Sequence, residues 1–136
     1  MEKWKLIEPV KGDHIRVKSN QLYHHGIYIG DEEVIQFGGP FDMFIKPESI
    51  VVEKVKIEAF LNGGFLEVKE FDRKERKVKK TPDEIVNTAI SLLGTGGYDI
   101  LRNNCEHFVN YCIFGVKKST QVDDLHKQIK EKLGKK

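Results

Sequence analysis

The sequence predicts an α+β fold, in which an antiparallel β-sheet packs against helices. Segments that alternate apolar and polar residues, the pattern of half-buried strands, dominate the first half of the chain. Helical periodicity with capping signals dominates the second half. Strands first and helices mostly after them indicate an antiparallel sheet with the helices packed on one side. At 136 residues the chain has the length of one domain with its own core.

Five segments are predicted to be strands, namely residues 14–18, 23–30, 34–37, 50–56 and 65–71. Gly12-Asp13 is a turn signal before the first strand. Asp31-Glu32-Glu33 separates the second strand from the third, which predicts a hairpin. Gly38-Gly39-Pro40 ends the hairpin and begins a loop to Pro47, and residues 57–61 are expected to form a short helical turn.

Three helices are expected after the strands. Thr81-Pro82-Asp83-Glu84 predicts a helix start, with Thr as N-cap, Pro at N1 and Glu closing a capping box, and Gly94 ends that helix. A second helix runs over residues 105–114, with Asn103 or Asn104 as its N-cap and a glycine as its C′ residue. A third, amphipathic and lysine-rich, is expected in residues 116–136.

Charge and hydropathy limit the possible partners. The formal net charge of +2 is too small to indicate a nucleic-acid-binding protein. Residues 72–80 include six basic residues, and such a run is more often a solvated connector than a patch for lipid headgroups or a partner. No apolar run approaches the ~20 residues of a membrane span, and the N-terminus lacks the apolar region of a signal peptide. We therefore expect a cytoplasmic protein, or one that is exported by a route without a recognisable signal.

The chain has two cysteines, Cys105 and Cys112. On one helix their Cα atoms would be roughly 10 Å apart, whereas a disulfide needs less than about 7 Å. Both are expected to be free thiols, which suits a reducing compartment. Cys105 lies in the first turn, where unpaired N–H groups and the helix dipole favour a thiolate. Cys112 is expected to be a small buried hydrophobe.

A cysteine nucleophile needs a base and a third group that orients the base. His24 and His25 are adjacent on a strand and therefore point to opposite faces. A three-residue loop over residues 30–32 places Gly26 opposite Gln36, so that His24 and Gln36 are diagonal neighbours. A two-residue loop would give that role to His25. Gly26 leaves room beside the base for a helix or a substrate.

The remaining histidines and a metal site are the alternatives. His107 is two positions from Cys105 on the helix and does not face it, so it is expected to be a packing residue, or one that acts through another side chain, rather than the base. His126 is expected on the polar side of the last helix. A zinc ion bound by Cys105, His107, Cys112 and His24 is the main chemical rival. The familiar Cys-x2-Cys and His-x3-His spacings are missing, which disfavours zinc.

Three motifs resemble those of one protein family. They are Asn-Asn-Cys-Glu-His-Phe-Val at 103–109, Tyr-His-His-Gly-Ile-Tyr-Ile-Gly at 23–30 and the strand start at Gly12-Asp13. Together they are similar to the lecithin:retinol acyltransferase-like domain, a branch of the NlpC/P60 superfamily of circularly permuted papain-like enzymes. The resemblance implies a single domain over residues 1–136, with its core at about 11–115, in which permutation places the histidine before the cysteine.

By this resemblance Cys105 is the nucleophile, His24 the general base and Gln36 the third polar residue. Many family members have histidine where this chain has Gln36. A neutral amide can fix the imidazole tautomer, although it cannot become charged. The backbone N–H of Cys105 is expected to bind the oxyanion, with Tyr23 and Asn104 as further candidates. The resemblance implies no metal and no organic cofactor.

The activity implied is acyl transfer through a thioester on Cys105. Water would resolve the thioester in a phospholipase or amidase, and an acceptor would do so in an acyltransferase. Phospholipids are the expected substrates, and peptide or isopeptide bonds, as in NlpC/P60 peptidases, are the alternative. Gln36 and the absence of an apolar C-terminal anchor keep open a catalytically weak domain that binds a lipid or a protein. Any contact with an anionic membrane is expected to be peripheral.

Overall fold

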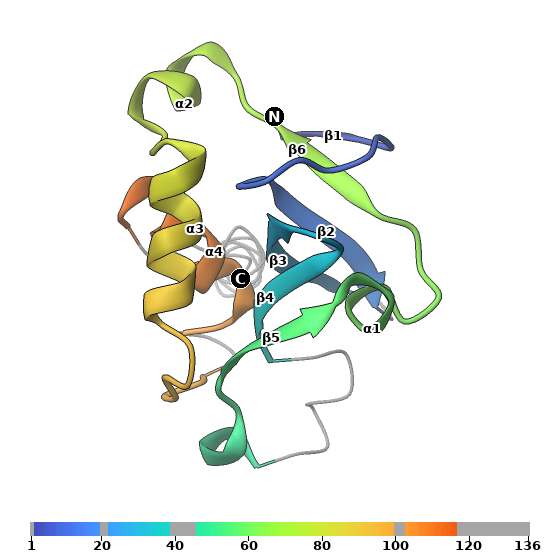
Figure 1. Ribbon diagram of the computed structural model, residues 1–136, viewed down its shortest axis with the longest axis vertical. Coiled ribbons are helices and arrows are strands. Elements are labelled where there is room, and N and C mark those ends of the chain that lie inside the picture. The colour runs from blue at the N-terminus through green and yellow to red at the C-terminus, as the bar shows by residue number, and fades with distance from the viewer. Residues whose placement is uncertain (1, 20–21, 39–45, 100–102, 117–136) are drawn as a thin grey trace, which may run out of the picture.

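The computed structural model (Figure 1) describes residues 2–19, 22–38, 46–99 and 103–116. One antiparallel sheet has its strands in the order β1-β6-β2-β3-β4-β5. The strands are β1 Lys3–Lys5, β2 His14–Ser19, β3 Leu22–Gly30, β4 Glu33–Phe37, β5 Val52–Lys56 and β6 Glu67–Glu70. The helices are a 3-10 turn at Pro47–Ser49, α1 Ile57–Leu61, α2 Arg73–Val78, α3 Pro82–Ser91 and α4 Cys105–Phe114. The α+β class is confirmed.

Helices lie on both faces of the sheet, which corrects the expectation of helices on one side only. Figure 1 shows α3 and α4 together on one side of the strands and α1 on the other. The core on the α4 side includes Ile27, Ile35, Ile85, Phe108, Val109 and Ile113. The core on the α1 side consists of Ile15, Val17, Val34, Phe60 and Val68. Because strand residues alternate between faces, β4 contributes Ile35 to the first core and Val34 to the second.

The β3–β4 hairpin reaches its predicted register through a different turn. Gly26 pairs with Gln36, as expected. The turn has two residues rather than three, Asp31 and Glu32, with φ values of 52° and 59°. Two left-handed residues are the requirement of a type I′ hairpin turn. A β-bulge over residues 28–30 inserts the extra residue, and so the shorter turn gives the register of the longer loop.

The start of α3 is confirmed in detail. The Thr81 side chain accepts a hydrogen bond from the N–H of Glu84, and the Glu84 carboxylate accepts one from the N–H of Thr81, each at 3.2 Å. Gly94, with φ of 85°, follows the helix end. The α4 helix ends at a left-handed residue, Gly115, as predicted.

Three elements were not predicted: β1, α2 and the 3-10 turn at Pro47–Ser49. β1 has three residues, too few for an alternating pattern to show, and it pairs with β6. α2 occupies most of the basic run at 72–80, which was expected to be a connector. Asp72 and Glu75 form a capping box at its start, and Glu75 also contacts the buried Lys69 Nζ at 3.0 Å. The lysine-rich helix predicted at 116–136, with His126, lies outside the described residues.

Candidate active site

Cys105 is the first residue of α4 and follows a well-formed helix cap. The Asn104 side-chain oxygen accepts hydrogen bonds from the N–H groups of Glu106 (3.0 Å) and His107 (3.1 Å). In return, His107 Nδ1 accepts the N–H of Asn104 at 3.1 Å. His107 thus occupies the place that Glu or Gln takes in a typical capping box. Its role at this end of the helix is structural, as predicted.

The Cys105 thiol is buried, with 8% of the residue exposed. Burial raises the pKa of Cys105 to about 11, because a thiolate loses its hydration there. Backbone hydrogen bonds from His25, Glu106 and Cys105 itself act in the opposite direction, and the charge of Glu106 adds to the increase. The expected lowering of this pKa at the helix N-terminus is therefore wrong, since desolvation outweighs the helix dipole. The resting residue is a neutral thiol.

The backbone of His25 hydrogen-bonds to the Cys105 sulfur, which places the thiol beside the first half of β3. At this end β3 pairs with β2 through His24 and His25, whereas its pairing with β4 begins only at Gly26. Cys105 therefore contacts β3 at a residue that, in the described ladder, is not paired with β4. This contact is to the backbone of His25, the residue that follows His24 in β3.

His24 and Gln36 form the pair predicted from the hairpin register. His24 Nε2 lies 2.8 Å from Gln36 Oε1, and both side chains are buried. An amide oxygen only accepts, so His24 donates through Nε2–H. The second ring nitrogen, Nδ1, then has the lone pair that can accept a proton.

The His24 ring is also held by packing. It stacks on Phe60 of α1 with the ring centroids 4.6 Å apart. Gly26, on the same face of β3, permits this approach, because a Cβ there would lie 2.7 Å from Phe60 Cε1 and 2.7 Å from Val34 Cγ1. The room expected beside the base is thus filled by a helix.

Gln36 has a second partner that sequence reasoning missed. Glu53 pairs with Gln36 across β4 and β5, and Gln36 Nε2 donates to Glu53 Oε1 at 2.9 Å. The alternation in residues 50–56 predicted the strand, but no turn signal fixed its register against β4. The sequence therefore did not indicate that Glu53 would lie opposite Gln36.

His25 belongs to a second buried pair, on the other face of β3. His25 Nδ1 lies 2.8 Å from His14 Nε2, and Trp4 packs edge-on against both rings. Burial, followed by nearby positive charges, lowers the pKa of His25 to about 3 and that of His14 well below its ordinary value. Both rings are neutral at neutral pH.

Tyr23 lies beside this second pair. The Arg16 guanidinium sits 3.7 Å from the centre of the Tyr23 ring and 4.0 Å from that of Trp4, and Arg16 Nε donates to Glu67 at 3.0 Å. The structure gives the Tyr23 ring a packing role. Its contribution to an oxyanion site stays a prediction.

The ligands of the zinc alternative do not assemble. Cys112 is in the apolar core, as predicted, where burial raises its pKa to about 12. His107 is used by the helix cap. Among the described residues, no group of three or more His, Cys, Asp or Glu side chains could hold a metal ion. In the same part of the chain, no helix has the length and apolar character needed to cross a membrane.

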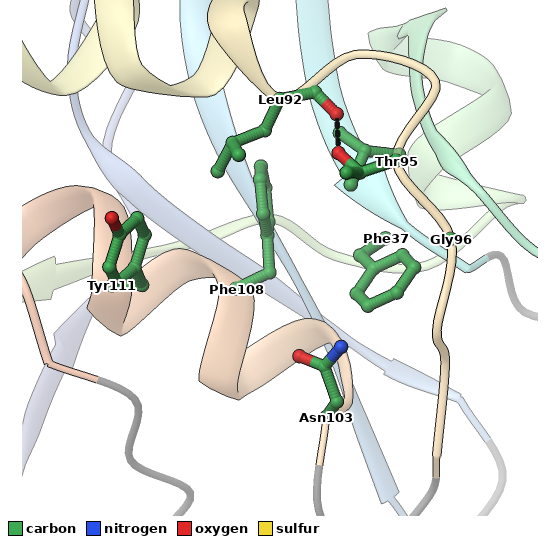
Figure 2. A pocket seen from close by; sticks show the side chains of 8 residues that line it. Phe37, Leu92, Thr95, Gly96, Asn103, Phe108 and Tyr111 are labelled. Carbon is green, nitrogen blue, oxygen red and sulfur yellow. Dashed lines mark hydrogen bonds between the residues drawn. The ribbon is translucent and has the colours of Figure 1, made fainter.

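An apolar pocket of about 260 Å³ lies beside α4 (Figure 2). Its walls come from β4, β5, the end of α3 with its following loop, and α4: Phe37, Val52, Leu92, Thr95, Gly96, Asn103, Phe108 and Tyr111. Phe108 is three residues after Cys105 and is therefore its neighbour on the helix surface. Asn103 Nδ2 donates to the Gly97 carbonyl at 3.0 Å and ties the loop to the start of α4. Sequence reasoning missed this pocket because separate elements build it.

The fold and the site together define a class of protein: an α+β domain with a buried cysteine at a helix start beside strands that carry a histidine–amide pair. A profile of the family described as lecithin retinol acyltransferase matches residues 7–118. The chain belongs to this family, and the resemblance drawn from the motifs is confirmed.

Named relatives agree with this assignment. Lecithin retinol acyltransferase of Bos taurus is 29% identical, with 89% of this chain and 61% of the relative aligned. The Homo sapiens protein of that name is 32% identical, over 88% of this chain and 61% of the relative. Phospholipase A and acyltransferase 3 of Homo sapiens is 28% identical, over 87% of this chain and 78% of the relative. The chain thus spans about three fifths of the length of the lecithin retinol acyltransferases it matches.

Proposed function

We propose that this chain is a thiol-dependent acyl-transfer enzyme of the phospholipase or acyltransferase type. Cys105 is the nucleophile, His24 the general base and Gln36 the residue that orients the base. The observation that carries the proposal is the buried His24–Gln36 hydrogen bond, next to the strand position that contacts the Cys105 sulfur. Membership of the family and the names of the relatives support the same chemistry.

In the first step the Cys105 Sγ–H proton moves to His24 Nδ1 while Sγ attacks the ester carbonyl carbon. A C–S bond forms, and the carbonyl π electrons move to the oxygen. The backbone N–H of Cys105, at the positive end of α4, is a donor for this oxyanion. Asn104 contributes by fixing the start of the helix, and the Tyr23 hydroxyl is a further candidate donor.

In the second step the oxyanion collapses and the C–O bond to the leaving group breaks. The leaving oxygen takes the proton from His24, and a thioester remains on Cys105. Water or an acceptor hydroxyl or amine then attacks the thioester, with His24 again as base, and the thiol is restored. Gln36 holds the Nε2–H of His24 throughout. No step requires a metal or an organic cofactor.

The neutral thiol determines when the base acts. Because burial raises the pKa of Cys105 to about 11, we expect the thiol proton to move to His24 as Sγ attacks rather than before. The reaction then requires His24 in its neutral form, with the Nδ1 lone pair available to take the proton.

The pocket beside α4 is suited to the apolar part of the substrate. Its lining is mainly apolar, and Phe108 places it one turn along the helix from Cys105. We assign it to an acyl chain of a phospholipid. Val52→Trp should reduce turnover of long-chain esters much more than that of acetyl esters, whereas Val51→Trp, at the exposed neighbouring residue, should affect both alike. Equal effects of the two variants would exclude this assignment.

A peripheral contact with an anionic membrane at the cytoplasmic side is part of the proposal. Arg73, Lys74 and Lys77 of α2 are exposed, and clustered basic residues attract anionic lipid surfaces. Reversing these three charges should abolish sedimentation with phosphatidylserine vesicles at low salt. Unchanged sedimentation would remove α2 from the proposal.

The central experiment is intact-mass spectrometry after incubation with a short-chain phosphatidylcholine. Wild type should gain the mass of one acyl chain, and Cys105→Ala should not. His24→Ala should also lose the adduct, while His25→Ala should retain it at reduced stability. The reverse result for the histidines would place the base on the other face of β3.

If wild type forms no adduct and releases no fatty acid, phospholipids are excluded as substrates. Peptide and isopeptide substrates, offered in the same assay, would then separate an amidase from a catalytically weak binding domain. A binding domain would show no Cys105-dependent product with any of them.

A further inference from the structure

Three side chains on three neighbouring strands form a line of hydrogen bonds. His24 on β3 bonds to Gln36 on β4 at 2.8 Å, and Gln36 bonds to Glu53 on β5 at 2.9 Å. We infer that Glu53 is a positioning residue, which fixes the amide of Gln36 and through it the tautomer of His24. The inference rests on the proposed function for its catalytic consequence, but not for the tautomer itself.

Glu53 determines which group donates and which accepts in each of these hydrogen bonds. An ionised carboxylate only accepts hydrogen bonds, so the Gln36 NH₂ group must face it. The Gln36 oxygen then faces His24 and accepts from Nε2–H. The proton of the imidazole is therefore held on Nε2, and Nδ1 has the lone pair.

Gln36 alone cannot make this choice. A side-chain amide has a donor end and an acceptor end of nearly equal size, and a half-turn exchanges them. With NH₂ toward His24, Nε2 would have to accept and the imidazole proton would move to Nδ1. That tautomer cannot take the Cys105 proton. Glu53 thus supplies the orientation that a neutral third residue lacks.

Glu53 is available for this role. It lies directly opposite Gln36 in the β4–β5 register. Among the described ion pairs, the two lysines of β5, Lys54 and Lys56, contact Glu33 and not Glu53. Glu33 therefore offers a matched control, a carboxylate on β4 without contact to the line.

The test compares Glu53→Gln, Glu33→Gln and the double variant Gln36→Glu/Glu53→Gln. Nitrogen NMR of the imidazole rings, with His24→Ala to assign the His24 signals, reports the tautomer without any substrate. Wild type and Glu33→Gln should show the Nε2–H form. Glu53→Gln should show a mixture, because an amide at 53 can donate or accept. The double variant should restore the Nε2–H form through the new carboxylate at 36.

The kcat of each variant should fall with the loss of the Nε2–H tautomer of His24. Loss of the group that orients a metal-bound histidine costs about tenfold to a hundredfold in metal affinity or activity. By the same scale, kcat of Glu53→Gln should fall about tenfold to a hundredfold with KM little changed. The double variant should recover kcat. The acid limb of its kcat/KM profile should move to higher pH, because a carboxylate beside His24 favours the imidazolium.

The outcomes separate the two proposals. If Glu53→Gln keeps both the wild-type tautomer and the wild-type kcat, or if Glu33→Gln has an equal effect, the positioning role is wrong. If the tautomer responds as expected but wild type processes no acyl substrate, the positioning role stands and the proposed function fails. Urea midpoints of the variants identify any loss that reflects unfolding.

Discussion

The His14–His25 pair should make this protein sensitive to mild acid. His25 has an ordinary pKa of 6.5 in the unfolded chain and a pKa of about 3 in the folded protein, where burial disfavours the charged ring. A depressed pKa contributes stability above pH 6.5 that is lost as pH falls toward 3. Between these values the unfolded chain binds a proton at His25 that the folded protein does not.

The magnitude follows from linkage. Each pH unit below 6.5 costs about 1.36 kcal/mol per such proton. On acidification from pH 7 to pH 5, the part below pH 6.5 covers about 1.5 pH units, so His25 alone should lower the free energy of unfolding by about 2 kcal/mol. The folded pKa lies well below this window, so the loss is set by the unfolded chain. His14, whose pKa is also lowered by burial and by His25, adds to the loss.

Urea unfolding of wild type and His25→Gln at pH 7 and at pH 5 provides the assay. The variant should be less stable at pH 7, because it breaks the bond to His14, but its further loss at pH 5 should be smaller by about 2 kcal/mol. This window lies above the titration of most carboxylates, which keeps their contribution small. If both proteins lose the same free energy between pH 7 and pH 5, His25 is not held neutral by burial and the reasoning is refuted.

Three further predictions concern the helix start and the base. In a Cys112→Ala background, iodoacetamide should modify Cys105 about 100-fold more slowly at pH 7 than an unhindered cysteine, because burial raises its pKa to about 11; a half-maximal rate at or below pH 8.5 would contradict this. Gly26→Ala should cost about 1–3 kcal/mol in urea unfolding, since its methyl group overlaps Phe60, and unchanged stability would show that the contact relaxes. Asn104→Ala should cost about 1–2 kcal/mol and lower kcat as well; a stability loss without a loss of kcat would show that the cap does not serve the site.

The geometry of the base could be predicted because it depends on local rules. Strand alternation and the pairing of Gly26 with Gln36 put His24 and Gln36 on one face, and the structure confirms that bond. The predicted turn was one residue too long, and the bulge in β3 was not predicted because the apolar pattern of the strand does not reveal it. These two errors of prediction have opposite effects on the register, so the predicted pairing of Gly26 with Gln36 was still correct.

The features that sequence reasoning missed depend on distant contacts. The Cys105 pKa is a balance between the helix N-terminus, which is local, and burial, which is set by the packing of the whole domain. Glu53 is opposite Gln36 only through the β4–β5 register. α2 forms in a run of charges because its cap and its contact to Lys69 order it, and composition alone indicated a connector.

The proposed site is divided between the two layers of the domain. His24, Gln36 and Glu53 come from neighbouring strands, whose spacing is set by backbone hydrogen bonds, whereas Cys105 comes from a helix whose height above the sheet is set by side-chain volume. Ile27, Ile35 and Val109 fill the layer between the sheet and α4 and set the height of that helix, whereas the His24 ring lies on the opposite face of β3, against Phe60. Trimming or enlarging them should change the distance from thiol to base while the hydrogen-bonded line in the sheet stays intact. Under the proposed function, substitutions in this interior should therefore change the catalytic rate while leaving the histidine tautomer as it is.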